Sequence, residues 1–496
     1  MHSLLTLAPM ALFLVAALAI GLLARRSTNA QGGSFASRYY IGNRTLGGFV
    51  LAMTTVATYG SVSSFVGGPG QAWLIGWGWV YMAAVQVTAL FLLYGILGKK
   101  MMLVSHKTGA VTVIDVIRRR YNSNALAAVS AVIIIVFFAA TMVAQFVGGA
   151  KLFEAVTGYS YELGLAIFGV VVILFTAIGG FRGVALTDAL CGIVMLLGLV
   201  ILAGGLVSAG GGLESLLQRA EAANPAISDP LSNGSMPYGL YFTQWLLVGI
   251  FTFCLPQSVV RCVGARDTKA LRSAMVIGTV VIGFMMILGT SMGVLSAGVL
   301  TQPLEAYGSV DGIIPAAIAT TLPPALAGVA IVGPIAASIS TVSSLLITAS
   351  SSIVKDLWMH SAAAKGRTLP ERHVVTASQA ITLGVGVLVF VLSLVPPSVI
   401  WKINMFAFGG LETAFCWVLV MGLFWKRATR AGAIASMAGG TLAYCACMAL
   451  GLKLFGLHQI VIGISVSLVL MVVVSLLTKR EDPATLVLFF PCEERS

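Results

Sequence analysis

Charged residues are scarce in this chain. Asp, Glu, Lys and Arg make up 9% of the 496 residues, whereas 58% are hydrophobic and the mean hydropathy is +0.99. Soluble domains carry about 25% charged residues, so the composition excludes a soluble protein. The net charge of +12 does not indicate nucleic-acid binding, because the basic residues follow a membrane topology described below.

Residues suited to metal or redox chemistry are also few. The chain has seven Cys and five His. No two Cys form a Cys-x-x-Cys pair, and all five His lie outside the apolar segments. These absences argue against a disulfide framework, a transition-metal site and a histidine proton relay. The apolar segments also lack a nucleophile–base pair and a phosphate-binding loop, so an enzyme is not indicated.

Long apolar runs, in contrast, recur along the whole chain. A helix needs about 20 apolar residues to cross a hydrocarbon core about 30 Å thick. The hydropathy predicts about thirteen spans, at residues 4–24, 47–73, 76–98, 125–153, 161–179, 187–208, 238–260, 273–299, 325–353, 375–395, 399–424, 432–451 and 459–478. The chain is therefore predicted to be an all-α polytopic membrane protein with a single membrane domain over residues 1–496.

Lys and Arg are concentrated in alternate loops. All 29 basic residues except Lys151, Arg219, Lys402 and Lys453 lie on one side of the predicted membrane, and Arg261 is counted on this basic side. Positively charged loops remain in the cytoplasm. With an odd number of spans, the N-terminus is predicted to lie outside, and the C-terminus with its tail, residues 479–496, in the cytoplasm.

Two of the apolar runs are interrupted near their midpoints. The run 47–73 is interrupted at Thr58-Tyr59-Gly60-Ser61, and the run 238–260 at Cys254-Leu255-Pro256-Gln257. In hydrocarbon, non-helical backbone persists only where it lines a cavity or is buried in protein. A matched pair of Gly- or Pro-interrupted spans is typical of the binding site of an inverted-repeat transporter.

The interrupted runs open two equivalent groups of five spans. The first group covers residues 47–208 and the second 238–424. An extra helix and loop precede them (1–46), and two accessory helices follow (432–478). This order predicts an inverted-topology five-helix repeat, with solute and ion sites between the groups at mid-membrane. The predicted activity is solute transport by alternating access.

The segment 333–358 is rich in small hydroxyl residues. Ala337, Ser340 and Thr341 stand at i, i+3 and i+4, so they share one helix face. Two hydroxyls and a carbonyl supply the oxygen ligands that a hard cation prefers, and unwound backbone near Ala57 and Gly60 would add others. Small residues also serve as packing surfaces in membrane helices, so this pattern alone leaves both interpretations open.

Several segments resemble one known family. YYIGNRTLGGFVLAMTTVATYGSVSSFVGGPGQAW, FTAIGGFRGVALTDALCGIVML and AASISTVSSLL are similar to the sodium:solute symporter family. ATYGSVSSFVGGPG, VAQFVGGAKL, LPQSVVRC and NMFAFGGLE resemble its pantothenate-transporting branch. The resemblance runs over almost the whole chain. It implies a LeuT-type core of ten helices with one extra helix before it, and sodium-coupled import of pantothenate.

The resemblance also implies sodium ligands. The family's shared sodium site falls on the backbone carbonyls of Ala57 and Gly60, and on Ala337, Ser340 and Thr341. Some members hold a second sodium, which here would be bound by Asp188, Ser340, Ser343 and Ser344.

Acidic residues near or within spans have alternative interpretations. Asp188 is either a sodium ligand or a helix N-cap at a cytoplasmic end, after Thr187. Glu412, an acid in the middle of a span, is either protonated or paired with Lys402 or Arg261.

Polar residues near the two interruptions are the candidate solute contacts. By resemblance and position these are Ser61, Ser64, Gln86, Gln145, Thr252, Pro256 and Gln257. Proline-transporting members carry Trp and Tyr where this chain has Val248 and Thr252, which argues against proline. The alternative for each candidate is that it satisfies backbone groups freed at the interruptions. Because this set contains no Lys or Arg, a carboxylate on the solute would be bound by sodium or by the N–H groups at half-helix N-termini.

Other functions stay open at this point. The nearest alternative is a sodium- or proton-coupled symporter for another small carboxylate or an amino acid, with Asp188 or Glu412 as the proton relay. A membrane sensor or scaffold with a transporter fold is more distant. We expect a monomer in the cell (inner) membrane, with the bilayer, sodium and the solute as partners and no nucleic acid.

Overall fold

The computed structural model describes residues 4–29, 35–231, 236–367, 369–395 and 400–490. His2, Cys492 and Arg495 lie outside these ranges. Within them the chain is almost entirely helical and forms no β-strand. The helices are α1 Leu4–Asn29, α2 Phe35–Ile41, α3 Gly48–Tyr59, α4 Gly68–Ile75, α5 Trp77–Ala84, α6 Val87–Leu92, α7 Lys99–Thr108, α8 Val113–Tyr121, α9 Asn124–Thr157, α10 Tyr161–Ala209, α11 Leu213–Ala223, α12 Tyr238–Trp245, α13 Pro256–Gly264, α14 Thr268–Ser296, α15 Ile313–Thr321, α16 Pro324–Ser351, α17 His360–Ala364, α18 Glu371–Leu392, α19 Ile400–Phe424, α20 Arg430–Ala449, α21 Gln459–Leu477 and α22 Pro483–Phe489.

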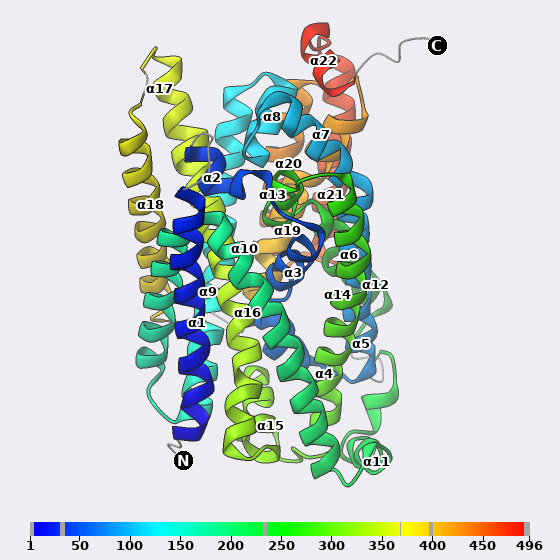
Figure 1. Ribbon diagram of the computed structural model, residues 1–496. Helices are drawn as coiled ribbons and strands as arrows, with labels where there is room; N and C mark the ends of the chain where they lie inside the picture. The colour runs from blue at the N-terminus through cyan, green and yellow to red at the C-terminus, as the bar shows by residue number, and fades with distance from the viewer. Residues whose placement is uncertain (1–3, 30–34, 232–235, 368, 396–399, 491–496) are drawn as a thin grey trace.

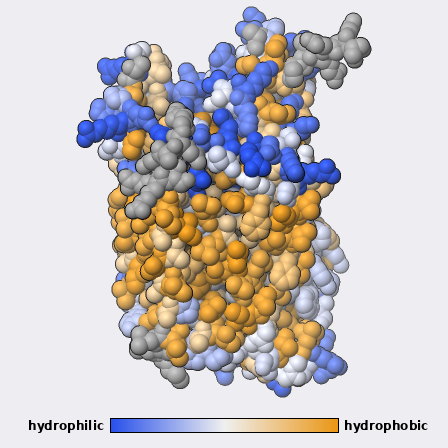
Figure 2. All heavy atoms as spheres, viewed as in Figure 1, coloured by the Kyte–Doolittle hydropathy of each residue, from blue (hydrophilic) through white to orange (hydrophobic). Residues whose placement is uncertain are grey.

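The long helices run side by side between two ends of the molecule. In Figure 1, α1 begins at the lower end and α22 lies at the upper end. Figure 2 shows a continuous apolar belt between them, with hydrophilic residues gathered most densely at the upper end. Among the described residues, eleven helices are long and apolar enough to cross a membrane, and the bent pair formed by α3 and the segment Ser63–Ile75 meets the same criterion when its two parts are taken together.

Helix α10 contains two of the predicted spans. Its 49 residues would extend about 74 Å if straight, more than twice the thickness of the hydrocarbon core. Gly180 leaves the helical conformation, at φ 58° and ψ −166°. This positive φ favours glycine, and a Cβ here would lie 2.8 Å from the Tyr39 ring. The predicted spans 161–179 and 187–208 therefore fall on either side of this bend.

The helices follow the predicted order of two groups of five. The first group runs from the broken α3–α4 span through α10, and the second from the broken α12–α13 span through α19. Helix α16 packs against α10, α9, α1 and α3. Its contact with α10 depends on small residues, because a Cβ at Gly198 would lie 2.9 Å from the carbonyl oxygen of Ala330. Helices α20 and α21 pack against each other and against α19.

Candidate functional site

Both predicted interruptions are present. Helix α3 ends at Tyr59, Gly60 is extended (φ −69°, ψ 109°), and the chain resumes as Ser63–Ile75 at an angle of 64° to α3. In the second span, a π-helical turn and a 3-10 turn follow α12, and Leu255 (φ −59°, ψ 125°) separates them from α13. Pro256 occupies the first turn of α13, where its missing N–H costs no intrahelical hydrogen bond.

Side chains satisfy part of the backbone freed at these interruptions. The Val62 N–H donates to Gln145 Oε1 at 2.9 Å. The Tyr59 hydroxyl donates to the Val248 carbonyl at 2.7 Å and lies 3.0 Å from the Thr252 hydroxyl. Tyr59 therefore ties the first broken span to the second. Buried polar groups must find such partners, so Gln145 and Thr252 support the interruptions.

The hydroxyl face of α16 lies against the end of α3. Thr341 Oγ1 lies 3.0 Å from the Ala337 carbonyl and 3.5 Å from the Thr58 carbonyl. Ala57, Ala337, Ser340 and Thr341 are all buried. The Ser340 hydroxyl has no hydrogen-bond partner among the described residues. An unpartnered buried hydroxyl costs about 1–3 kcal/mol, and a bound cation would use its free oxygen.

Asp188 and Arg261 form a buried ion pair beside this face. Arg261 Nη2 lies 3.2 Å from Asp188 Oδ2, and the two side chains are 1% and 0% exposed. Thr54 and Ser344 also bond to Asp188 Oδ2, at 2.7 and 3.3 Å. Two interpretations are thereby wrong. Arg261 is not a loop residue, and Asp188 is not an N-cap, because it lies inside α10 two turns beyond the bend at Gly180.

Glu412 is buried in α19, and no charged residue in the described part of the chain pairs with it. Neither of its carboxyl oxygens has a hydrogen-bond partner among the described residues. Lys402 is exposed, and Arg261 is paired with Asp188. The predicted pairing of Glu412 with Lys402 or Arg261 is therefore wrong, which leaves the uncharged form as the remaining interpretation.

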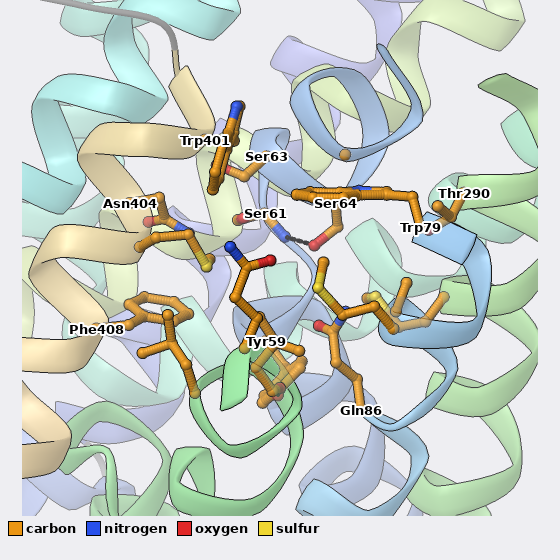
Figure 3. Close-up of a pocket in the computed structure, with 18 of the residues that line it drawn as sticks. Tyr59, Ser61, Ser63, Ser64, Trp79, Gln86, Thr290, Trp401, Asn404 and Phe408 are labelled. Carbon is orange, nitrogen blue, oxygen red and sulfur yellow. Dashed lines mark hydrogen bonds between the residues drawn. The ribbon is translucent and has the colours of Figure 1, made fainter. Parts of the chain in front are cut away.

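A cavity opens between the two broken spans. Its volume is about 60 Å³, so the cavity is narrow in this conformation. Figure 3 shows Asn404 and Phe408 on one side and Trp79 and Gln86 on the other, with Ser64 between them. The lining residues are Tyr59, Ser61, Ser63, Ser64, Gly68, Trp79, Met82, Ala83, Gln86, Gln244, Leu247, Val248, Met286, Thr290, Trp401, Asn404, Met405, Phe408 and His458.

Several polar atoms of this lining lack a hydrogen-bond partner within the described part of the chain. They are Ser63 Oγ, Gln244 Oε1, Asn404 Oδ1 and Trp401 Nε1. The set offers neutral acceptors and donors, and the lining contains neither Lys nor Arg. Burial and the charge of Lys453 lower the pKa of His458 from 6.5 to about 4, so this imidazole is neutral at neutral pH. The cavity therefore suits a solute rich in hydroxyl and amide groups.

The predicted solute residues divide into two sets. Ser61, Ser64 and Gln86 line the cavity. The others lie outside its lining, namely Gln145, Thr252, Pro256 and Gln257. Of these, Gln145 and Thr252 bond to the interruptions as described above. Sequence reasoning missed Trp79 and Trp401, whose rings meet edge to face at 5.3 Å, and Asn404. The one available signal was the NMFAFGGLE segment, which begins at Asn404.

The model for the sodium:solute symporter family matches residues 39–440 of this chain. The chain belongs to the sodium:solute symporter family. Among its relatives, the sodium/pantothenate symporters of Haemophilus influenzae and Escherichia coli K12 are 39% and 37% identical to it. The alignments cover 91% and 93% of this chain, and 93% and 94% of the relatives. The symporter is thus a sodium-coupled membrane transporter, as predicted, and its family and relatives are transporters rather than enzymes.

A solved structure extends the comparison to the fold. The substrate-bound, outward-open state of a Na⁺-coupled sialic acid symporter matches the model with a TM-score of 0.82 at 17% sequence identity. The match covers 97% of this chain and 100% of the other. The LeuT-type fold predicted for the symporter is therefore confirmed.

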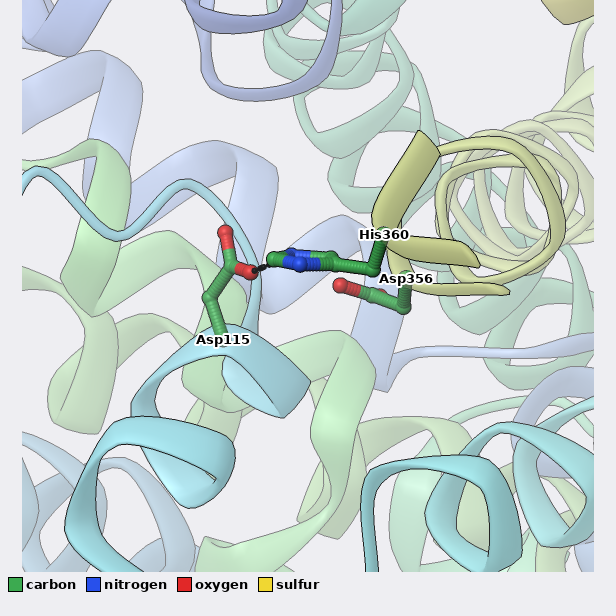
Figure 4. Close-up of side chains that lie close together, drawn as sticks. All are labelled: Asp115, Asp356 and His360. Carbon is green, nitrogen blue, oxygen red and sulfur yellow. Dashed lines mark hydrogen bonds and ion pairs between the residues drawn. The ribbon is translucent and has the colours of Figure 1, made fainter. Parts of the chain in front are cut away.

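A second polar cluster lies away from the cavity. Figure 4 shows Asp115 of α8 facing His360, with Asp356 beside them. Their ligand atoms lie within 4.8 Å of one another. Asp115 also forms ion pairs with Lys355 Nζ at 3.6 Å and with Arg118 Nη1 at 3.8 Å. The cluster therefore links α8 to the end of the α16 span through ion pairs.

The symporter should lose stability when Asp115 is replaced by Asn. Burial raises the pKa of Asp115, but the His360 hydrogen bond and the Lys355 charge outweigh it and lower the pKa from 3.8 to about 2. A depressed carboxyl pKa stabilises the fold above pH 3.8, and this contribution disappears as the pH falls towards 2. We expect the free energy of unfolding to fall by about 2 kcal/mol at pH 7, measured by denaturation in detergent.

The control for this variant is Glu371→Gln. Glu371 pairs with Arg38 at 2.8 Å, but its side chain is 60% exposed, and such pairs contribute only about 0–1 kcal/mol. Equal destabilisation by both variants, or an Asp115→Asn effect that does not shrink below pH 4, would contradict the assigned ion pairs.

Proposed function

We propose that this symporter imports pantothenate together with sodium. Two relatives that align with nearly the whole chain are sodium/pantothenate symporters. The single observation that carries the proposal is the cavity between the broken spans, with its neutral and unpartnered polar atoms.

Pantothenate fits this cavity chemically. It has one carboxylate, one amide and two hydroxyls. The amide and the hydroxyls can form hydrogen bonds with the unpartnered atoms of Ser63, Gln244, Asn404 and Trp401. Because the described lining has no Lys or Arg, another source of positive charge must bind the carboxylate of the solute. Bound sodium and the N–H groups at the start of Ser63–Ile75 supply that positive potential.

The proposed sodium site uses the end of α3 and the hydroxyl face of α16. The ligands are the carbonyl oxygens of Ala57, Gly60 and Ala337 and the hydroxyls of Ser340 and Thr341. The free Ser340 hydroxyl supports this assignment, as does the approach of Thr341 to the Thr58 carbonyl at 3.5 Å. Sodium beside the broken α3 would stabilise the bent shape that also forms the solute cavity, which couples the two ligands.

The proposed orientation places the N-terminus outside and the C-terminus in the cytoplasm of the cell (inner) membrane. The dense hydrophilic end seen in Figure 2 supports it, because basic loops remain cytoplasmic. We propose that a monomer is sufficient for transport, since the cavity and the sodium ligands come from one chain.

A competition experiment tests the solute. Purified symporter in proteoliposomes is given labelled pantothenate under a sodium gradient, with unlabelled pantothenate, proline or sialic acid in excess. We expect pantothenate alone to abolish labelled uptake. Absence of labelled uptake, or equal competition by proline, would overturn the proposed solute.

Cavity residues should alter the affinity for the solute. Ser61→Ala, Ser64→Ala and Gln86→Ala each remove a hydrogen-bonding group worth about 0.5–1.5 kcal/mol. At saturating sodium, the apparent KM for pantothenate should therefore rise several-fold in each variant. A matched control is Ser296→Ala, because within the described ranges the Ser296 hydroxyl bonds to its own helix alone, at the Met292 carbonyl. Unchanged KM values in all three cavity variants would remove these residues from the solute site.

A further inference from the structure

A basic pocket lies at the end of the symporter where α22 packs, apart from the cavity between the broken spans. Its volume is about 680 Å³. Helix α22 packs against α7 and α8, and Figure 1 shows these three helices together at the upper end. Four lysines of the described chain line the pocket, namely Lys99, Lys100, Lys107 and Lys426. The fold therefore brings lysines from α7 together with one that follows α19.

These four lysines lack an anionic partner within the described part of the chain. None of them takes part in the ion pairs that the described residues form. The described lining of the basic pocket also contains no Asp or Glu. Positive charges at close quarters repel one another, so an anion bound between them would be stabilised.

Aromatic rings hold two of the lysines and an arginine around one point. Lys100 Nζ lies 4.7 Å from the centroid of the Phe424 ring and 4.5 Å from that of Phe490, which directly follows α22. Lys426 Nζ and the guanidinium carbon of Arg120 lie 5.9 and 5.6 Å from the Phe490 centroid. A cation within about 6 Å of a ring centroid is attracted to the ring. Three positive charges therefore surround one ring, an arrangement that membrane topology alone does not require.

The outer wall of the basic pocket is apolar. Ile96, Leu103 and Phe424 line it and are 38%, 49% and 49% exposed. All three belong to candidate membrane spans, Trp77–Thr108 and Ile400–Phe424, and exposed apolar residues of such spans face hydrocarbon. An occupant can therefore place an anionic group among the lysines and an apolar chain along this wall.

We propose that the basic pocket binds an anionic phospholipid, with its phosphate among the lysines and an acyl chain along the apolar wall. Lysine binds phosphate as a point charge, and basic pockets between membrane helices bind anionic headgroups. A zwitterionic lipid fits less well, because the lysines repel the cationic group of its headgroup. This inference goes beyond the proposed function, since it does not depend on the transported solute.

Native mass spectrometry of the delipidated symporter in detergent tests the site. The protein is titrated with phosphatidylglycerol and with phosphatidylcholine, and bound phosphatidylglycerol is then challenged with inorganic phosphate at matched ionic strength. We expect phosphatidylglycerol to bind about 10-fold or more tightly than phosphatidylcholine, and inorganic phosphate not to displace it. Equal binding of the two lipids, or displacement by inorganic phosphate, would overturn the inference.

A double variant assigns the binding to the basic pocket. Lys100→Gln/Lys426→Gln removes two of its charges, so the affinity for phosphatidylglycerol should fall about 10-fold or more, while that for phosphatidylcholine stays the same. The matched control is Lys269→Gln/Lys365→Gln, which removes two exposed lysines on the basic side but outside the pocket. The control should stay within about twofold of the original protein. An equal loss in both variants would indicate a general charge effect and overturn the inference.

A second pair of lysines keeps the test decisive if the first variant does not fold. Lys99→Gln/Lys107→Gln changes two exposed side chains of the same pocket, and we expect about a fivefold or larger loss of affinity for phosphatidylglycerol. Unchanged affinity in a folded variant of the pocket would overturn the inference. It would favour the chain's own Glu493 and Glu494, which lie outside the described residues, as the partners of the lysines.

Discussion

Replacing both Ser340 and Thr341 with alanine should raise the sodium concentration for half-maximal uptake about 10-fold or more. The double change removes two of the few oxygens proposed to hold the ion, and each 1.4 kcal/mol of lost binding is about a tenfold change in affinity. The Ser340 hydroxyl has no other partner among the described residues. Uptake is measured against sodium at saturating pantothenate, because ion and solute affinities are thermodynamically linked.

A matched double variant on the same helix controls for helix damage. Thr348 and Ser351 also lie on α16, but their hydroxyls bond to the carbonyls of Ser344 and Thr348, at 2.8 and 2.7 Å. Thr348→Ala/Ser351→Ala should therefore leave the sodium curve within about twofold. An unchanged curve in a correctly inserted Ser340→Ala/Thr341→Ala protein would show that the shared sodium site is misassigned.

Replacing Gln145 with methionine should weaken sodium and solute binding together. Gln145 Oε1 accepts from the Val62 N–H, directly after the break in the first span. Methionine keeps the size and removes the acceptor, and an unpaired buried N–H costs about 1–3 kcal/mol. The bent shape becomes less populated, so both apparent affinities fall by the same factor. We expect about a 5-fold or larger rise in both half-saturation concentrations.

The same substitution at Gln257 separates this effect from a general one. Gln257 lies at the other broken span, and its side-chain oxygen has no hydrogen-bond partner within the described residues. Gln257→Met should therefore change both concentrations less than twofold. A Gln145→Met protein in which only the pantothenate KM changes would assign Gln145 to solute contact, the role predicted from its position in the sequence.

The sequence predicted the elements that depend on local chemistry. Both broken spans were visible because Gly60 and Pro256 interrupt apolar runs, and hydrocarbon tolerates such interruptions only at sites or inside protein. The hydroxyl face of α16 followed from residue spacing. The bend in α10 was found as a gap between two apolar runs around Gly180.

Features made by distant residues were not predictable in this way. Arg261 stands at the end of an apolar run, where a basic residue usually marks the cytoplasmic boundary. Its burial depends on Asp188, 73 positions earlier. Trp79 and Trp401 were not proposed for the cavity, since aromatic residues in spans are ordinarily packing residues. Their contact joins spans from the two halves.

For two polar residues, position in the sequence did not distinguish solute contact from support of the interruptions. Gln145 and Thr252 are polar residues in apolar spans, and position near the interruptions suggested solute contact. In the structure they bond to Val62 and Tyr59, the alternative that buried backbone requires. Sequence position placed them at the right level of the membrane, but the side on which each group lies depends on tertiary packing.

Sodium-driven uptake of labelled pantothenate tests the central claim most directly. Purified symporter in proteoliposomes is given labelled pantothenate under an inward sodium gradient, and separately under an equal potassium gradient with an inward proton gradient. The account predicts accumulation above equilibrium only with sodium, and its collapse when an ionophore dissipates the sodium gradient. Accumulation driven by protons without sodium, or no accumulation with sodium, would contradict it.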